Sequence, residues 1–285
     1  MTATSLGQYL TIVRGLRRRW HIPKKDELWF RAEDTKHRRT HLQPGLYRPR
    51  PSGKRKSVKT LLDLENDLYE EFQRCATQLS DIRSSDDQPE WNSYFLMQHH
   101  GVPTRLLDWS DGALIALHFA VRDKSLPTKS GATIYVLDPY WLLDELDENP
   151  DRDDTKRRWK DHLASIKASP GTEDHWEALY LPSDPEERAR RKLTTPQIPL
   201  LWDSPHVTRR VAAQRSRFMI FGTDPQWLSA LVNRPNSRLR TITITTGSIG
   251  RIRQELKDAG VTESVVFPDL DGLGRELRQN WQMRR

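Results

Sequence analysis

The chain has 285 residues, of which 35% are hydrophobic and 30% charged, with a formal net charge of +7 and a sequence pI near 9.5. This length and composition suffice for one large core, and no run of about 18 apolar residues is present that could cross a bilayer. We therefore expect no membrane partner, and the positive charge favours a polyanion or a phosphate-bearing small ligand as a partner.

The first residues and the cysteine count bear on the compartment. The first 16 residues lack an apolar segment followed by a small-residue cleavage site. The single cysteine, Cys75, has no second cysteine with which to form an internal disulfide. Both observations predict a cytoplasmic protein. We expect one domain over residues 1–285, with residues 1–27 as an N-terminal helical segment.

The first predicted elements are a helix and a strand. Apolar residues at helical spacing predict an amphipathic helix over residues 3–20. Residues 28–32, with sequence Leu-Trp-Phe-Arg-Ala, predict a buried strand that carries Arg31. A buried guanidinium needs an anionic partner, because an unpaired buried charge costs several kcal/mol, roughly. That partner is an internal carboxylate or a ligand phosphate, and the sequence leaves both open.

A basic stretch follows the strand. Residues 36–59 contain nine Lys and Arg residues and no Asp or Glu. This stretch, Lys36 to Lys59, is called the basic lobe below. It predicts a surface that contacts a polyanion, and a solvated basic loop is the alternative. The next element is a strongly amphipathic helix over residues 60–80, in which Glu65 lies near the apolar face and is expected to meet an arginine such as Arg31.

The densest group of polar side chains lies in residues 91–121. A helix is predicted from Trp91 to His99 and ends before Gly101 and Pro103, two residues that do not continue a helix. Residues 104–109 predict a short strand, and an alanine-rich helix follows it. Polar groups concentrated between apolar segments indicate a functional site.

His99 and His100 are candidates for proton transfer or substrate contact, because imidazole titrates near neutral pH. Metal binding is not predicted: adjacent histidines on a helix point in different directions, and no cysteine or carboxylate set completes the ligands. Arg31 and Arg105 together are predicted to clamp a diphosphate, since the planar guanidinium suits two-point contact. Asp108 and Arg105 should point to opposite faces, so each needs a partner elsewhere.

The rest of the chain alternates strands and helices irregularly. Strands are predicted at residues 131–138 and 239–245, and an amphipathic helix at residues 248–259. Residues 142–192 contain 14 acidic and 10 basic residues, so we predict that residues 144–195 form a peripheral charged helical insertion. Regular βαβ units are too few for a doubly wound sheet, and we predict an α+β fold with a mixed sheet and flanking helices.

Several of these segments together resemble the FRG domain family, which is named for an aromatic-Arg-Gly tripeptide. Two positions depart from the family pattern: Ala32 stands where the glycine of the name is expected, and Ser216 stands where a glycine usually follows the glutamine. The resemblance implies the family fold and bacterial or phage-related settings. The matching segments are Phe30-Arg31-Ala32, Leu42 to Arg48, Glu65 to Phe72, Gln98 to Trp109, Gln214 with Phe218, and Val266 to Leu273.

The order of segments is also similar to that of ADP-ribosyltransferases, and this resemblance implies NAD as the cofactor. Arg31 would orient NAD, Ser110 or Thr104 would shape the nicotinamide pocket, and Gln214 would take the position of a late glutamate. Because glutamine lacks a carboxylate, Glu65 or Asp108 would have to supply one. The residues expected in catalysis are His99, Glu65, Asp108 and Gln214, and those expected at the cofactor are Arg31, His100, Thr104, Arg105, Trp109, Ser110 and Phe218.

The leading hypothesis for function is an NAD-binding, ADP-ribosyltransferase-like effector that modifies a protein or nucleic acid, as a toxin or a phage-defence protein does. The alternative hypothesis is a nucleic-acid-binding or nuclease-like module that uses the basic lobe and has no NAD chemistry.

Overall fold

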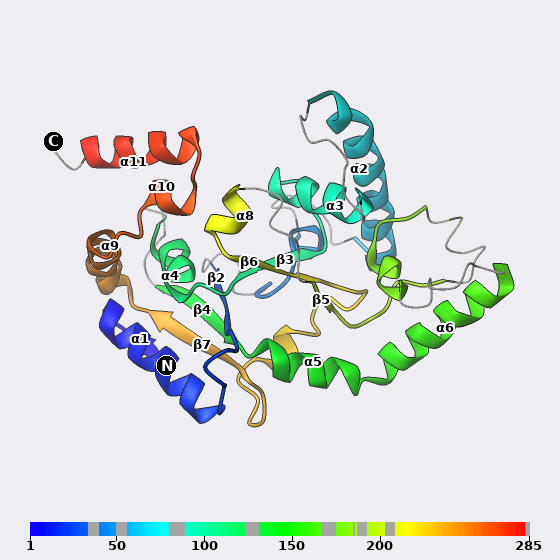
Figure 1. Ribbon diagram of the computed structural model, residues 1–285, viewed down its shortest axis with the longest axis horizontal. Coiled ribbons are helices and arrows are strands. Elements are labelled where there is room, and N and C mark those ends of the chain that lie inside the picture. The colour runs from blue at the N-terminus through cyan, green and yellow to red at the C-terminus, as the bar shows by residue number, and fades with distance from the viewer. Residues whose placement is uncertain are drawn as a thin grey trace.

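The computed structural model describes residues 1–33, 40–49, 56–79, 89–122, 131–166, 175–184, 186, 193–202 and 209–282. They form a seven-stranded sheet in the order β1-β7-β4-β2-β3-β6-β5, with helices packed on its faces (Figure 1). Neighbouring strands are antiparallel except β1 and β7, so the predicted α+β class with a mixed sheet is confirmed. The strands are β1 (Thr2–Ala3), β2 (Trp29–Glu33), β3 (Leu106–Ser110), β4 (Ala132–Leu137), β5 (Leu200–Trp202), β6 (Ser216–Ile220) and β7 (Leu239–Ile244).

The helices predicted at residues 3–20, 60–80, 91–99 and 248–259 are present to within a few residues. The described α-helices are α1 (Leu6–Arg19), α2 (Val58–Leu79), α3 (Pro89–His99), α4 (Ala113–Val121), α5 (Pro139–Asp147), α6 (Pro150–Ile166), α8 (Arg209–Ala213), α9 (Ile249–Asp258), α10 (Glu263–Val266) and α11 (Leu270–Gln282). Short 3-10 helices lie at η2 (Gly45–Tyr47), η3 (Trp176–Tyr180), η4 (Ser229–Leu231) and η5 (Thr246–Ser248). No described helix is both long and apolar enough to span a bilayer.

Two separate cores cover one face of the sheet. Helices α1, α4 and α9 pack on the half formed by β1, β7, β4 and β2, where residues such as Phe30 and Ile134 face them. Helices α2 and α3 pack on the half formed by β3, β6 and β5, where Leu106 and Phe218 face them. A third core lies on the opposite face and includes residues of both halves, such as Trp29 and Trp109. The junction of β2 and β3 therefore lies where the two cores of one face meet.

The charged segment at residues 144–195 has an outer and an inner part. Helix α6 lies along the edge of the molecule, far from α10 and α11 (Figure 1). By contrast, Trp176 and Tyr180 of η3 are buried with α2 and α3 in one core. This inner part carries packing residues, and residues 167–174, 185 and 187–192 of the segment lie outside the described residues.

The two halves of the sheet meet at a narrow point. Within the described residues, β2 and β3 are in register at a single pair, Phe30 with Ser110. Beyond that pair the strands diverge, and Nη1 of Arg31 donates to the main-chain oxygen of Asp108 across the opening at 2.6 Å. The side chain of Arg31 thus takes the place of a continued strand ladder.

Candidate functional site

A cavity of about 670 Å³ lies at the opening between β2 and β3. Its walls come from β2, β3, α4, α8, β6, α10 and α11 and from residues at their ends, so segments far apart in the sequence meet there. This volume lies within the range typical of small-molecule binding sites. Its charged lining comprises four arginines, Arg31, Arg122, Arg210 and Arg275, and three acidic residues, Glu33, Asp108 and Glu263.

Arg31 at the β2 side of the cavity has an internal carboxylate as its partner. Its Nε lies 3.0 Å from Oε1 of Glu33, two residues further along the same strand. The same carboxylate oxygen accepts from Nη2 of Arg48 at 2.8 Å, and its other oxygen accepts from the main-chain nitrogen of Leu42 at 3.0 Å. The sequence left the partner of Arg31 open between a carboxylate and a phosphate, and the carboxylate is present. The expected partner Glu65 is replaced by Glu33.

Asp108 supplies the carboxylate on the β3 side. Its two carboxylate oxygens accept from Nε2 of Gln98 at 3.3 and 3.2 Å, and Oε1 of Gln98 accepts from the hydroxyl of Thr104. Solvent reaches the residue, but desolvation by the surrounding protein raises the pKa of Asp108 above its usual range, against the opposing effects of Arg31, Gln98 and Arg210. Asp108 is therefore a more proton-attracting carboxylate than an ordinary aspartate.

Ser110 and Gln214 lie next to each other at the bottom of the opening. The hydroxyl of Ser110 donates to the main-chain oxygen of Gln214 at 2.7 Å and accepts from the main-chain nitrogen of Gly112 at 3.0 Å. The side-chain nitrogen of Gln214 donates to the main-chain oxygen of Val266 at 3.3 Å. These bonds join the end of β3 to α8 and α10.

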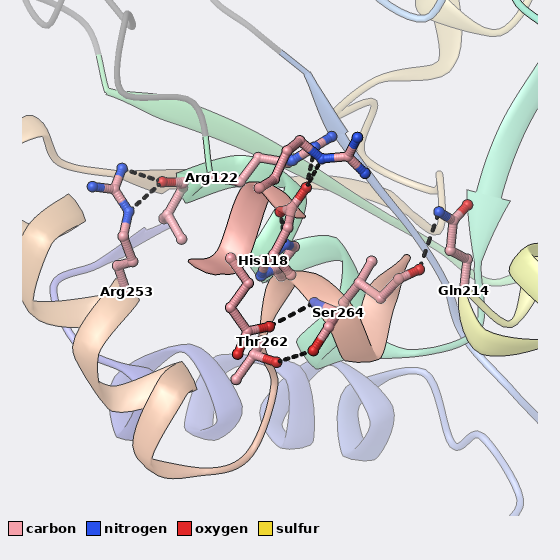
Figure 2. A network of polar contacts seen from close by, with 11 residues as sticks. His118, Arg122, Gln214, Arg253, Thr262 and Ser264 are labelled. Carbon is pink, nitrogen blue, oxygen red and sulfur yellow. Dashed lines mark hydrogen bonds and ion pairs between the residues drawn. The ribbon is translucent and has the colours of Figure 1, made fainter. Parts of the chain in front are cut away.

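Glu263 organises the helical wall of the cavity. It is buried, and its Oε1 accepts from Nη2 of Arg122 at 2.6 Å and from Nε of Arg275 at 2.8 Å. Its Oε2 lies 3.1 Å from Nε2 of His118. Figure 2 shows His118 of α4, and Arg122 directly after that helix, beside the segment that carries Thr262 and Ser264. Three helices, α4, α10 and α11, are thereby held together through one carboxylate.

The protonation of this network follows from its surroundings. Desolvation works to raise the pKa of Glu263, but Arg275, Arg122 and His118 outweigh it and hold that pKa below its usual value. Desolvation, aided by Arg122 and Arg253, lowers the pKa of His118 in spite of the contact with Glu263. The neutral imidazole therefore donates to an ionised carboxylate at neutral pH.

Five of the residues predicted for the site line this cavity. They come from β2, β3 and α8: Arg31, Asp108, Trp109, Ser110 and Gln214. Trp109 is 3% exposed, and its indole nitrogen has no hydrogen-bond partner among the described residues. The cavity thus brings together predicted residues from three separate segments of the chain.

The two predicted histidines lie at the end of α3 and do not line the cavity. The rings of His99 and His100 are 5.1 Å apart and nearly perpendicular. Desolvation, Arg210 and His100 lower the pKa of His99. The described residues contain no group of three or more His, Cys, Asp or Glu side chains that could hold a metal ion.

Glu65, Thr104, Arg105 and Phe218 lie inside the protein, away from the cavity lining. Nε of Arg105 lies 2.5 Å from Oε2 of Glu65, and both side chains are inaccessible to solvent. The predicted clamp of Arg31 with Arg105 is therefore absent, because the guanidinium of Arg105 is directed into the core. The carboxylate of Glu65 is likewise bonded to Arg105 inside the protein and does not reach the cavity.

The comparison with known families covers the first half of this site. Residues 26–129 match the FRG domain family. The chain contains an FRG domain. The FRG match includes β2, α2, α3, β3 and α4, and the cavity walls from α8, β6, α10 and α11 lie beyond it. The comparison with curated proteins and that with solved structures found no match.

The sequence prediction missed five charged residues of the cavity lining: Glu33 on β2, and Arg122, Arg210, Glu263 and Arg275 in the helical wall. The last four lie on four different helices or at a helix end. Arg122 directly follows an apolar helix, as Arg31 follows apolar residues in its strand. An arginine at the end of an apolar segment is the one local signal in the sequence that indicated Arg122.

Proposed function

We propose that the cavity binds NAD or a related nucleotide and that the protein transfers ADP-ribose from NAD to a macromolecular acceptor. The observation that supports this proposal is that Arg31, Ser110 and Gln214 line one cavity. These are the residues that the resemblance to ADP-ribosyltransferases assigns to orienting NAD, shaping the nicotinamide pocket and the late catalytic position. They lie on three different elements, β2, β3 and the end of α8.

The chemistry of the lining suits such a ligand. Four arginines provide donors for a diphosphate, and Phe30 and Phe119 provide apolar surface for a ring. The guanidinium of Arg31 is already oriented by Glu33 and by the oxygen of Asp108. A ligand diphosphate at Arg31 would therefore meet a donor that needs no reorganisation.

Asp108 is the residue that we assign to proton transfer. NAD supplies the bond between ribose and nicotinamide that is broken in the transfer. Asp108 takes the proton that the acceptor hydroxyl or amine loses as it bonds to C1′ of the ribose, and nicotinamide leaves with the electron pair of the broken C–N bond. The raised pKa of Asp108 makes its ionised form a better proton acceptor, and Gln98 holds the carboxylate in place.

The test is incubation of the purified protein with NAD labelled on its adenylate and with bacterial lysate, following nicotinamide release and label in macromolecules. We expect Asp108→Asn to abolish both signals and Arg31→Ala to weaken NAD binding, with both variants folded. Asp161→Asn, on the exposed surface of α6, is the matched control and should behave as wild type. Absence of NAD binding, nicotinamide release and labelling in the wild type would overturn the proposal.

Binding of a polyanion by the basic lobe is a second proposal, supported by its nine basic residues without an acid. Residues 36–39 and 50–55 of the lobe lie outside the described residues. In the described part, Lys56 and Lys59 are exposed, whereas Arg48 is paired with Glu33. Retention of RNA or DNA that falls with salt, and that is lost on neutralising Lys56 and Lys59, is the expected result. Retention unaffected by these changes contradicts it.

A further inference from the structure

Three arginines converge on one aromatic ring at the helical end of the cavity. The guanidinium carbons of Arg122, Arg210 and Arg275 lie 4.3, 4.7 and 4.9 Å from the centroid of Phe267. All three arginines line the cavity, and they come from α4, α8 and α11. Each distance is within the range of a cation–π contact, so three positive charges lie close together around the ring of Phe267.

The positive charge of this cluster is only partly compensated. Glu263 accepts one N–H from Arg122 and one from Arg275, which leaves the other N–H groups of both guanidiniums available. Arg210 makes no hydrogen bond or ion pair with a carboxylate in the described part of the chain, although Asp269 and Asp108 are near enough to act on it electrostatically. Desolvation, together with Arg122 and Arg275, lowers the pKa of Arg210. An anion at this position would relieve the repulsion.

The backbone around Phe267 fixes this arrangement. A Cβ atom on Gly272 would lie 2.0 Å from the main-chain oxygen of Phe267, so the close approach of α11 to Phe267 requires glycine. Phe119 of α4 packs nearly perpendicular to Phe267, with ring centroids 5.7 Å apart. The ring, and the guanidiniums around it, are therefore held by packing as well as by charge.

We propose that Arg122, Arg210 and Arg275 form a phosphate-binding subsite for a phosphate group of a nucleotide ligand, with Arg210 as its principal donor. The inference rests on the proposed function only in taking the cavity as a ligand site, and it does not depend on NAD or on transfer. A phosphate carries about two negative charges and several acceptor oxygens, which match three guanidiniums with donors to spare. The subsite lies beside Asp108, the residue assigned to proton transfer.

Arg210 is the diagnostic position for a test. Removing Arg122 or Arg275 would disturb Glu263, which holds three helices together, whereas Arg210 has no such bond to lose. Arg209, its neighbour on α8, is exposed and does not line the cavity, so Arg209→Ala is a matched control with the same loss of charge.

The experiment is calorimetric titration of the full chain with ADP, inorganic pyrophosphate and adenosine. We expect ADP to bind more tightly than adenosine, and Arg210→Ala to weaken ADP and pyrophosphate by about tenfold or more while adenosine is unchanged. Arg210→Lys should give an intermediate loss, and Arg209→Ala none. The proposal is overturned if wild type binds neither ADP nor pyrophosphate, or if Arg210→Ala binds them as wild type does. Binding of ADP through Arg210 by a protein inactive on NAD would overturn the transfer reaction and leave the subsite standing.

Discussion

Arg105 is fully buried and Arg210 is half-buried at the cavity, and the partners of their guanidiniums differ. The guanidinium of Arg105 donates to Glu65, to the main-chain oxygen of Phe221 at 3.2 Å and to that of Tyr180 at 2.5 Å. The second oxygen of Glu65 accepts from the hydroxyl of Tyr94 and from the main-chain nitrogen of Arg105. Both side chains of this pair have internal partners, and neither residue lines the cavity between β2 and β3.

Arg210 has the opposite arrangement. It lines the cavity, lies beside two other arginines and makes no carboxylate hydrogen bond among the described residues. The partners of an arginine, more than the fact that it is partly or fully buried, separate a structural role from a binding role. A guanidinium whose donors are all used inside the protein stabilises the fold, whereas one with unused donors beside a cavity is available to a ligand.

The largest effect on stability is expected when the buried ion pair of Glu65 and Arg105 is broken. Glu65→Leu leaves the guanidinium of Arg105 buried and unpaired, and we expect the free energy of unfolding to fall by about 3–5 kcal/mol. Urea unfolding followed by circular dichroism measures it. Glu71→Leu on the same helix removes an exposed ion pair with Arg74 and should leave the midpoint unchanged. Equal midpoints for the two variants would contradict the structural role of Glu65.

A smaller effect is expected at Tyr94. Its hydroxyl donates to Glu65 at 2.5 Å and accepts from the main-chain nitrogen of Arg105 at 3.0 Å. Tyr94→Phe removes this group but keeps the ring, so we expect a loss of about 1–2 kcal/mol in the same unfolding measurement. Tyr140→Phe, at a residue that is 44% exposed, is the control. A Tyr94→Phe variant as stable as wild type would show that the network does not need the hydroxyl.

The cavity network, unlike the buried pair, contains a histidine, and this predicts a pH dependence. The pKa of His118 is lower in the folded protein than its usual 6.5, so the unfolded chain binds more protons there as the pH falls below that value. Stability should therefore fall as the pH is lowered from neutrality. The groups that face His118 are Glu263, Arg122 and Arg253. His118→Gln keeps a donor for Glu263 but does not titrate, and its stability should change less over this range in unfolding curves at several pH values. If stability depends on pH as steeply in His118→Gln as in the wild type, groups other than His118 cause the pH dependence.

The smallest effect on stability is expected at Arg210. Arg210→Ala removes a charge that two neighbouring arginines disfavour, so the unfolding free energy should change by about 0.5 kcal/mol or less. The same variant should lose ADP affinity, which would complete the contrast with Glu65. A thermal unfolding scan of Arg210→Ala measures this change. A large destabilisation would mean that Arg210, like Arg105, has a structural role.

Local patterns in the sequence predicted the elements well. Helices α2 and α9 and strands β4 and β7 follow from the spacing of apolar residues, because each pattern lies within one element. The partner of Arg31 was missed, although alternation along a strand places residues 31 and 33 on the same side.

The spacing of residues in the sequence could not predict the contacts at the helical end of the cavity. Arg122 and Glu263 are 141 residues apart, and their contact depends on how α10 and α11 return to α4. Arg105 and Glu65 show the same difficulty, since an arginine in a polar motif and a glutamate on an amphipathic helix both resemble site residues until their contact is seen. Charge type is visible in the sequence, but the pairing of charges is a property of the tertiary fold.

The single register pair of Phe30 with Ser110 has a consequence for solubility. Where β2 and β3 diverge, each strand presents an inner edge in the middle of the sheet, and exposed strand edges promote association between chains. Helix α4 packs against both strands at this place, and Arg31 occupies the oxygen of Asp108. The same side chains that shape the cavity therefore also shield two strand edges, so a variant that opens this wall should aggregate before it unfolds.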